Sequence, residues 1–370
     1  MSGYFLYHSI GTYAAKEMEL ATALSDFASV WSAPDDGQWG AVLQKKQEFI
    51  QHWAQLIGAG ADEITLTDNV TAGLYSVIGA LPKHYLQGRS LLVAQDCFPS
   101  LHFLLQKLAP RFGFTLRTVP VRPGQAYVSD DDFIDAWDDS VGLALLTWVS
   151  STSSHRIDVA RMAQKARQHG SLAALDITQG VGIVPFQVHE DIAFTLSASL
   201  KWLCGVSGAC MLHARRDILV QCEPEYRGWF SQENPFSWDL DRFQYASDAR
   251  RFDNGTPSVL GGIASLPGIR YVAAQGVAAL QEQNQALTSV ILDYAQAQGW
   301  TLVTPRSAHE RGGSIMLRAK DAQSATALVS TLREQQLYCD HRDGVIRLSP
   351  GNITAEDAVI RLCETLKSGL

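Results

Sequence analysis

Two stretches of the chain, LDITQGVGIVPF at residues 175–186 and LSASLKWLCGVSG at residues 196–208, say most about how it folds. Each begins with apolar residues and ends in a loop of polar and small residues, which is typical of a buried strand that reaches the edge of a sheet. The first stretch places the carboxylate of Asp176 at a strand end, and the second places Lys201 among apolar neighbours. Ligands bind at such strand ends in open α/β sheets, so the two stretches together predict a site there.

The same alternation of strands and helices extends to both sides of these stretches. It predicts an α/β fold, in which a large domain has a mostly parallel sheet sandwiched by helices. Helices are predicted at residues 14–56, from 71, and at 101–108 and 158–169, and strands at 64–67, 90–94, 114–119, 141–148, 171–175, 192–196 and 209–213.

The last quarter of the chain has a different pattern, which predicts a small C-terminal α+β domain. Helices are predicted at residues 277–298, 322–335 and 355–366, and strands at 300–303, 313–318 and 344–348. Because single cores stop growing at about 250–300 residues, a chain of 370 residues is expected to divide. We expect a large domain at residues 15–275 and a small domain at residues 276–370, joined by the N-terminal segment 1–14.

Composition and charge exclude several classes of protein. The formal net charge is −8 and no long run of Lys or Arg occurs, so a nucleic-acid partner is not expected. The longest apolar run, at residues 141–149, is too short to span a membrane, and the N-terminus lacks the features of a signal peptide. The six cysteines have no CxxC spacing, which predicts free, mostly buried thiols and a cytoplasmic protein.

Polar residues directly follow five of the predicted strands. Because the carboxyl ends of parallel strands meet at one edge, these segments are expected to lie together and to supply hydroxyls, one buried carboxylate and one lysine. The five segments are residues 67–71, 95–100, 150–156, 176–179 and 197–201.

Each of these signals also has a simpler structural explanation. Asp176 could cap a helix or pair with a structural arginine, and Lys201 could be a surface lysine whose stem packs on Trp202. Thr71, at the start of a helix, could be an ordinary N-terminal cap rather than part of a phosphate site. A lysine in an apolar setting nevertheless suits imine formation, because burial lowers the pKa of its amine.

Together these residues resemble the fold-type I pyridoxal phosphate enzymes, which have the aspartate-aminotransferase-like fold. Within them the chain is most similar to the class V aminotransferase group and its kynureninase-like branch, over nearly its whole length. The resemblance rests on the Asp-x-x-Gln-x-x-Gly element at residues 176–182 and on the lysine 25 residues after Asp176. It implies that Lys201 binds pyridoxal 5′-phosphate covalently, that Asp176 holds the ring nitrogen protonated, and that Gln179 lies near the ring's phenolic oxygen.

The resemblance also implies a set of cofactor contacts. TDNVTAG, at residues 67–73, is similar to the family's phosphate loop, and DCFPS, at residues 96–100, is similar to an element that stacks an aromatic side chain on the ring. The residues implied are Val70, Thr71 and Ser199 at the phosphate, Phe98 on the ring, and Ser100 and Ser151 close to the cofactor.

Three further residues are implied by elements later in the chain. FDNGTPS places Thr256 at the phosphate of a partner subunit, which implies a homodimer with shared active sites. YRGWF places Trp229 facing the cofactor. YCDHRDGVIRLSPGN, at residues 338–352, is similar to the element whose arginine, here Arg347, binds the carboxylate of an amino acid substrate. Phe98 and Trp229 could instead be core residues, and Arg347 could form a structural ion pair.

The sequence departs from kynureninases at three places. Leu200 stands where they have a tyrosine and Gln179 where they have a histidine, and Gly351-Asn352-Ile353 follows the late proline where they have Leu-Tyr-Asn. The expected reaction is therefore either kynureninase-like lyase or hydrolase chemistry or transamination. Two alternatives remain: a protein of this fold that binds the cofactor without turnover, and a desulfurase-type lyase. A nicotinamide-dependent dehydrogenase would need a Gly-x-Gly-x-x-Gly after an early strand, but the early strands end in TDNVTAG and QDCFPS.

Overall fold

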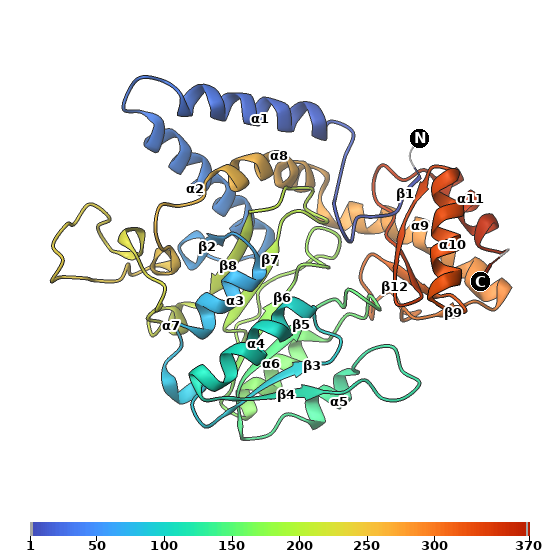
Figure 1. Cartoon of the computed structure of the whole chain (residues 1–370), viewed down its shortest axis with the longest axis horizontal. Helices are drawn as coiled ribbons and strands as arrows, with labels where there is room; N and C mark the ends of the chain where they lie inside the picture. The colour runs from blue at the N-terminus through green and yellow to red at the C-terminus, as the bar shows by residue number, and fades with distance from the viewer. Residues whose placement is uncertain (1–2, 368) are drawn as a thin grey trace.

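The computed structural model describes residues 3–367 and 369–370. Its main feature is a seven-stranded sheet with the order β2-β8-β7-β6-β5-β3-β4 (Figure 1). All the strands except β8 run in the same direction, because β8 is antiparallel to both of its neighbours. The strands are β2 (Ile64–Thr67), β3 (Ser90–Ala94), β4 (Thr115–Val119), β5 (Val141–Thr147), β6 (Leu172–Asp176), β7 (Phe194–Ala198) and β8 (Cys210–Ala214).

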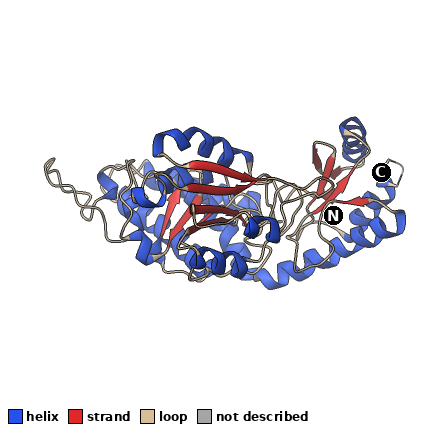
Figure 2. Cartoon of the chain, turned by 90° about the horizontal axis from the view of Figure 1, so that it is seen from below, coloured by secondary structure: helices blue, strands red, loops and turns tan. Residues whose placement is uncertain are grey.

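Helices cover both faces of this sheet (Figure 2). Strand β5 shows why: Ala144 and Leu146 pack into one apolar core, while Leu143 and Leu145 pack into the other. A strand buried on both faces must be apolar at every position, as its sequence predicts. One core contains side chains of α2 (Gln38–Ile57), α5 (Asp130–Asp135), α6 (Val159–Gln168) and α8 (Leu260–Gln275), and the other those of α3 (Val70–Ile78), α4 (Pro99–Phe112) and α7 (Arg216–Leu219). The mostly parallel sheet between helices confirms the predicted fold class.

A second, smaller sheet lies at the C-terminal end of the chain. It is antiparallel, with the order β12-β13-β10-β9, and the apolar side chains of three helices share its core. This confirms the predicted C-terminal α+β unit. Its elements are α9 (Val277–Gln298), β9 (Thr301–Leu302), β10 (Ile315–Arg318), α10 (Ala322–Glu334), β12 (Asp340–Arg342), β13 (Val345–Leu348) and α11 (Glu356–Leu366).

The N-terminal segment belongs structurally to this C-terminal unit. Strand β1 (Gly3–Tyr4) pairs in parallel with β11 (Leu337–Tyr338), and Phe5 is fully buried in the same core. The chain then crosses to the large sheet, where α1 (Lys16–Trp31) begins. The domain boundary at residues 275/276 remains a prediction. It coincides with the break between α8 and α9 at Gly276. The φ of Gly276 is 78°, a left-handed conformation that glycine adopts without strain.

Two helical predictions differ from the structure. The single helix expected at residues 14–56 is two helices, α1 and α2, because Pro34 and Gly37 interrupt it. Helix α8 was not predicted, since it contains three glycines and Pro267. Its glycines let it pack closely: a side chain at Gly268 would collide with the backbone of Cys204. Tertiary packing, rather than helix propensity, therefore stabilises α8.

Two expectations about composition can be compared with the described part of the chain. All six cysteines are free and buried there, as predicted. Among the described residues, no helix has the length and the apolar character that crossing a membrane requires. A cytoplasmic location stays a prediction.

Candidate functional site

A cavity of about 570 Å³ opens at the carboxyl end of the large sheet. This volume is within the range of roughly 300–1,000 Å³ that small-molecule sites occupy. All five segments that follow the predicted strands contribute to its wall, so the structure brings them together. The predicted site residues that line it are Val70, Thr71, Phe98, Ser100, Ser151, Asp176, Gln179, Lys201 and Arg347.

Lys201 follows β7 and reaches into this cavity from a largely apolar loop. Its ammonium lies 5.5 Å from the centre of the Phe98 ring. Burial lowers the pKa of Lys201 to about 8, although the carboxylate of Asp176 partly opposes this shift. An amine with this pKa is partly neutral near physiological pH, and it can therefore act as a nucleophile or a base.

Asp176 ends β6 and is buried beside Lys201. One of its oxygens accepts a hydrogen bond from the backbone N–H of Thr178 at 3.0 Å. Burial raises the pKa of Asp176, while hydrogen bonds from Thr178 and the charge of Lys201 act in the other direction. No arginine or lysine forms a salt bridge with Asp176 in the described part of the chain. A buried carboxylate without an ionic partner suits a protonated ring nitrogen.

Another part of the cavity wall contains a helix N-terminus. Helix α3 begins at Val70, and the side chain of Asn69 caps it by accepting a hydrogen bond from the N–H of Ala72 at 2.8 Å. The backbone N–H groups of the first turn have no partners within the helix. That of Val70 contacts the sulfur of Cys210, and that of Thr71 is available to an anion. Ser207 and Gly208 line the cavity next to this turn.

Arg347 enters from the small sheet. Its side chain is about 90% buried, and its Nε donates a hydrogen bond of 2.8 Å to Asp340. Its Nη1 lies 3.5 Å from the carbonyl oxygen of Ser151, so the arginine spans from the small sheet to the loop after β5. Residues from both sheets therefore form this site.

The N-terminal segment closes one side of the cavity, which the sequence did not reveal. His8 and Ser9 both line the wall, and the side-chain nitrogen of Gln179 donates to the carbonyl oxygen of His8 at 3.2 Å. Asp340 was also missed. The Asp-Gly pair at residues 343–344 was the signal that could have revealed it, because such a pair favours a two-residue hairpin and fixes the register of its strands.

Three predicted site residues lie outside the wall of this cavity in the single chain. The hydroxyl of Ser199 is buried against Ser265 and the carbonyl of Val206.

Thr256 lines an adjoining cavity of about 510 Å³ that shares Asp68 and Gly208 with the first. Trp229 packs against Phe230 and Phe236, beside a projecting segment at residues 232–245 (Figure 1).

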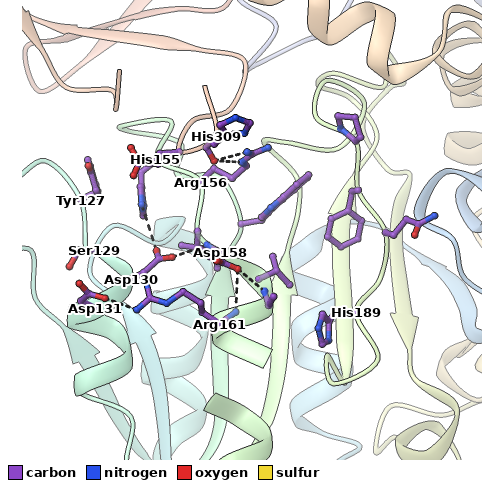
Figure 3. Close-up of a pocket in the computed structure, with 18 of the residues that line it drawn as sticks. Tyr127, Ser129, Asp130, Asp131, His155, Arg156, Asp158, Arg161, His189 and His309 are labelled. Atoms are coloured by element: carbon purple, nitrogen blue, oxygen red, sulfur yellow. Dashed lines mark hydrogen bonds and ion pairs between the residues drawn. The ribbon is translucent and has the colours of Figure 1, made fainter. Parts of the chain in front are cut away.

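A separate groove of about 910 Å³ is lined in part by residues that follow β5 (Figure 3). His155 and Asp130 point toward each other at its inner end, 3.6 Å apart, and Arg156 donates from Nε to the carbonyl oxygen of His309 at 3.0 Å. His309 and Glu310 belong to the C-terminal unit, so this groove is a seam between the two parts of the molecule. No lysine lines it.

The chain matches the family model for class-V aminotransferases over residues 40–344. It belongs to the class-V aminotransferase family. Members of this family use pyridoxal 5′-phosphate as their cofactor, and the family match confirms the resemblance seen in the sequence. The described residues fit that cofactor, because a half-buried lysine, a buried carboxylate and a helix N-terminus face one cavity.

Curated relatives carry two kinds of name. The chain is 24% identical to "Uncharacterized aminotransferase YcbU" of Bacillus subtilis, over 84% of the chain and 80% of that protein. It is 27% identical to the kynureninase of Bacillus anthracis, over 80% of the chain and 71% of that enzyme. The class-V family relationship is therefore clear, while the relatives differ in the reactions that their names describe.

Solved structures show the same fold. The cysteine desulfurase of Thermococcus onnurineus NA1 superposes with a TM-score of 0.85 at 18% identity, over 99% of this chain and 94% of that one. The cystine C–S lyase C-DES, solved with cysteine persulfide, superposes with a TM-score of 0.85 at 20% identity, over 100% and 98% of the two chains. At this identity the likeness establishes the fold alone.

Proposed function

We propose that this class-V enzyme acts on a small amino acid, with Lys201 holding the cofactor covalently and Arg347 binding the substrate carboxylate. The observation that supports this most is the arrangement of three groups around one cavity. The amine of the half-buried Lys201 and the buried carboxylate of Asp176 lie at neighbouring strand ends of the large sheet, and the buried guanidinium of Arg347 enters from the small sheet. An amino acid offers an amine and a carboxylate that match this arrangement.

The cofactor, when bound, withdraws electrons from the substrate's α-carbon. Asp176 would keep a proton on the ring nitrogen, since an unpaired buried carboxylate gains from a cationic partner. Phe98 would pack on the ring, and the amides of Val70 and Thr71 would bind the phosphate, with Ser100 and Ser151 nearby. Lys201 would accept the proton from the α-carbon, and burial suits it to this role by lowering its pKa to about 8.

A desulfurase-type reaction fits the site poorly, although two structural neighbours catalyse cysteine chemistry. Such a reaction needs a thiolate to carry sulfur. Burial raises the pKa of all six cysteines to about 12, which includes Cys210 at the wall of the cavity and Cys339 beside β12. These thiols stay protonated at neutral pH and are weak nucleophiles. We therefore favour kynureninase-like or aminotransferase chemistry.

A homodimer with shared sites is part of the proposal. The projecting segment at residues 232–245 exposes Phe236, Trp238 and Leu240, which are between 73% and 96% exposed in the single chain. An exposed apolar cluster of this kind is typical of a surface that another protein covers. Thr256 and Trp229 lie close to this segment in sequence and outside the cavity of their own chain, so they are available to the site of a second copy.

The experiment that separates the two reactions adds amino acids to the purified protein while the absorbance of the cofactor is followed. A transaminase converts the cofactor stoichiometrically when no keto acid is present, and the absorbance band is lost. A kynureninase-like enzyme turns over with the band retained and releases anthranilate from L-kynurenine. A yellow protein that responds to no amino acid would instead indicate a binding protein without turnover.

A further inference from the structure

The hairpin that carries Arg347 also places an acid directly opposite it. Strands β12 and β13 are joined by Asp343 and Gly344, whose φ angles of 47° and 77° are both positive, as a tight two-residue hairpin requires. The register that follows pairs Asp340 with Arg347. Residues paired across strands project to the same face, so the two side chains must meet.

Asp340 occupies one particular edge of the guanidinium. Its Oδ1 accepts from Nε of Arg347 at 2.8 Å, and its Oδ2 accepts from Nη2 at 2.5 Å. A guanidinium has five N–H groups in a fixed planar fork. Asp340 engages Nε and one N–H of Nη2, and the carbonyl oxygen of Ser151 lies 3.5 Å from Nη1. One N–H of Nη1 and one of Nη2 remain, and these are the two donors of the Nη1–Nη2 edge that can bind a carboxylate.

His8 holds Asp340 in turn. Its Nε2 lies 3.0 Å from Oδ1 of Asp340, and its Nδ1 lies 2.7 Å from the hydroxyl of Ser349. Burial lowers the pKa of His8, although Asp340 opposes this shift. A neutral His8 that donates from Nε2 to Asp340 and accepts at Nδ1 from Ser349 satisfies both contacts.

The same histidine connects the two ends of the site. His8 is 2% exposed and its backbone carbonyl accepts the hydrogen bond from Gln179, which follows β6. His8 therefore contacts both the wall that carries the buried carboxylate of the large sheet and the hairpin that carries Arg347. A displacement of the N-terminal segment would therefore disturb both the loop that carries Gln179 and the hairpin that carries Arg347.

We propose that Asp340 and His8 are positioning residues that fix the guanidinium of Arg347 so that its Nη1–Nη2 edge receives the substrate carboxylate. This inference rests on the proposed function. It competes with a simple electrostatic expectation: Asp340 is an anion next to an anion-binding site, so its removal should strengthen the binding of a carboxylate. Positioning predicts that Asp340→Asn binds a substrate carboxylate more weakly, whereas the electrostatic expectation predicts that it binds the carboxylate more tightly.

The test compares the binding of L-alanine with that of ethylamine, which is alanine without its carboxylate. Apparent dissociation constants are measured from the absorbance of the cofactor in the wild type, Asp340→Asn and His8→Phe. The ratio of the ethylamine constant to the alanine constant reports recognition of the carboxylate alone. Asp138→Asn is the matched control, because Asp138 accepts from Arg117 at 3.0 Å on the exposed surface of the large domain.

Positioning predicts that Asp340→Asn lowers this ratio by about tenfold or more, since a misaligned charged hydrogen bond loses most of its value. His8→Phe should lower it by a smaller factor, and the ethylamine constants should stay unchanged. Asp138→Asn should match the wild type. A ratio within about twofold of the wild type or above it in Asp340→Asn, or an equal loss of ethylamine binding, would overturn the proposal.

Two further readouts separate this inference from the proposed function. If the wild type itself binds alanine no better than ethylamine, Arg347 is not the carboxylate receptor and the proposed function fails at that point. The second readout needs no cofactor: in the apoprotein, the Nε–H of Arg347 should exchange slowly with water by NMR, because Asp340 engages it. Faster exchange is expected in Asp340→Asn, and unchanged exchange would contradict the pairing.

Discussion

The backbone N–H of Gly11 donates a hydrogen bond of 2.8 Å to the carbonyl oxygen of Leu200, the residue before Lys201. Gly11 also packs directly on the backbone of Lys201, which leaves no space for a side chain. Lys16 reinforces this contact, since its ammonium donates to the carbonyl oxygens of Gly11 and Gly205. The N-terminal segment therefore holds the loop that carries the central lysine.

Gly11→Ala should destabilise the protein and weaken its hold on the cofactor. An added methyl group would collide with the carbonyl of Lys201, and overpacking of this kind costs about 1–3 kcal/mol. Urea unfolding of the apoprotein measures the loss. Gly40→Ala is the control, because a side chain there meets nothing within 4 Å in helix α2, and it should be neutral or stabilising. Equal stability of the two variants would show that the contact is unimportant.

Lys201→Met should stabilise the apoprotein at pH 7, by an amount that shrinks as the pH rises. Burial depresses the pKa of Lys201 from 10.5 to about 8, so the folded state binds the proton less tightly than the unfolded state does. The cost of this is fully present below pH 8 and disappears as the pH approaches 10.5. The expected gain is on the order of 3 kcal/mol at neutral pH. A difference in stability that does not depend on pH between 7 and 10 would contradict a depressed pKa.

Asp176→Asn should reduce turnover by about a hundredfold or more while the cofactor still binds, because an amide cannot hold the ring nitrogen protonated. The same substitution should stabilise the apoprotein at neutral pH. Burial raises the pKa of Asp176, so its ionised form is unfavourable in the folded state above the normal pKa of the acid. Steady-state kinetics and unfolding of the apoprotein together test this. A variant with normal turnover would exclude the proposed role.

The large sheet and its site could be predicted because their sequence signals are local. Apolar runs end in polar residues at β5, β6 and β7, and the parallel direction of these strands brings Asp176 and Lys201 to one edge. The same reasoning placed Val70 and Thr71 at the start of a helix. The position of Arg347 followed only from the resemblance to a family.

The remaining parts of the site depend on contacts between distant segments, which no local pattern encodes. His8 reaches the cavity because β1, which begins at Gly3, pairs with β11, which begins at Leu337 near the other end of the chain. At the end of β7, the side chains of Ala198 and Leu200 face the cavity, and Ser199 between them faces the other way. The hydroxyl of Ser199 therefore contacts Ser265 of α8, a helix that the sequence did not predict. Placing Ser199 correctly would have required knowledge of that packing.

Subunit mixing tests whether Thr256 serves the site of a partner. Thr256→Val alone should weaken the binding of pyridoxal phosphate in a homodimer, since a hydroxyl contact to the phosphate is lost. A mixture with Lys201→Met should contain mixed dimers, in which the intact Thr256 of one chain meets the intact Lys201 of the other. Tight binding should return in half of the sites of each mixed dimer. If mixing restores nothing, Thr256 acts within its own chain or not at all.

Borohydride reduction of the holoprotein, followed by peptide mass spectrometry, tests the covalent attachment on which the account depends. A pyridoxyl group should be found on the peptide that contains Lys201, and Lys201→Ala should lose both the label and the absorbance that depends on it. A label on Lys16 or another lysine, or an unlabelled protein that still binds the cofactor, would contradict the central assignment.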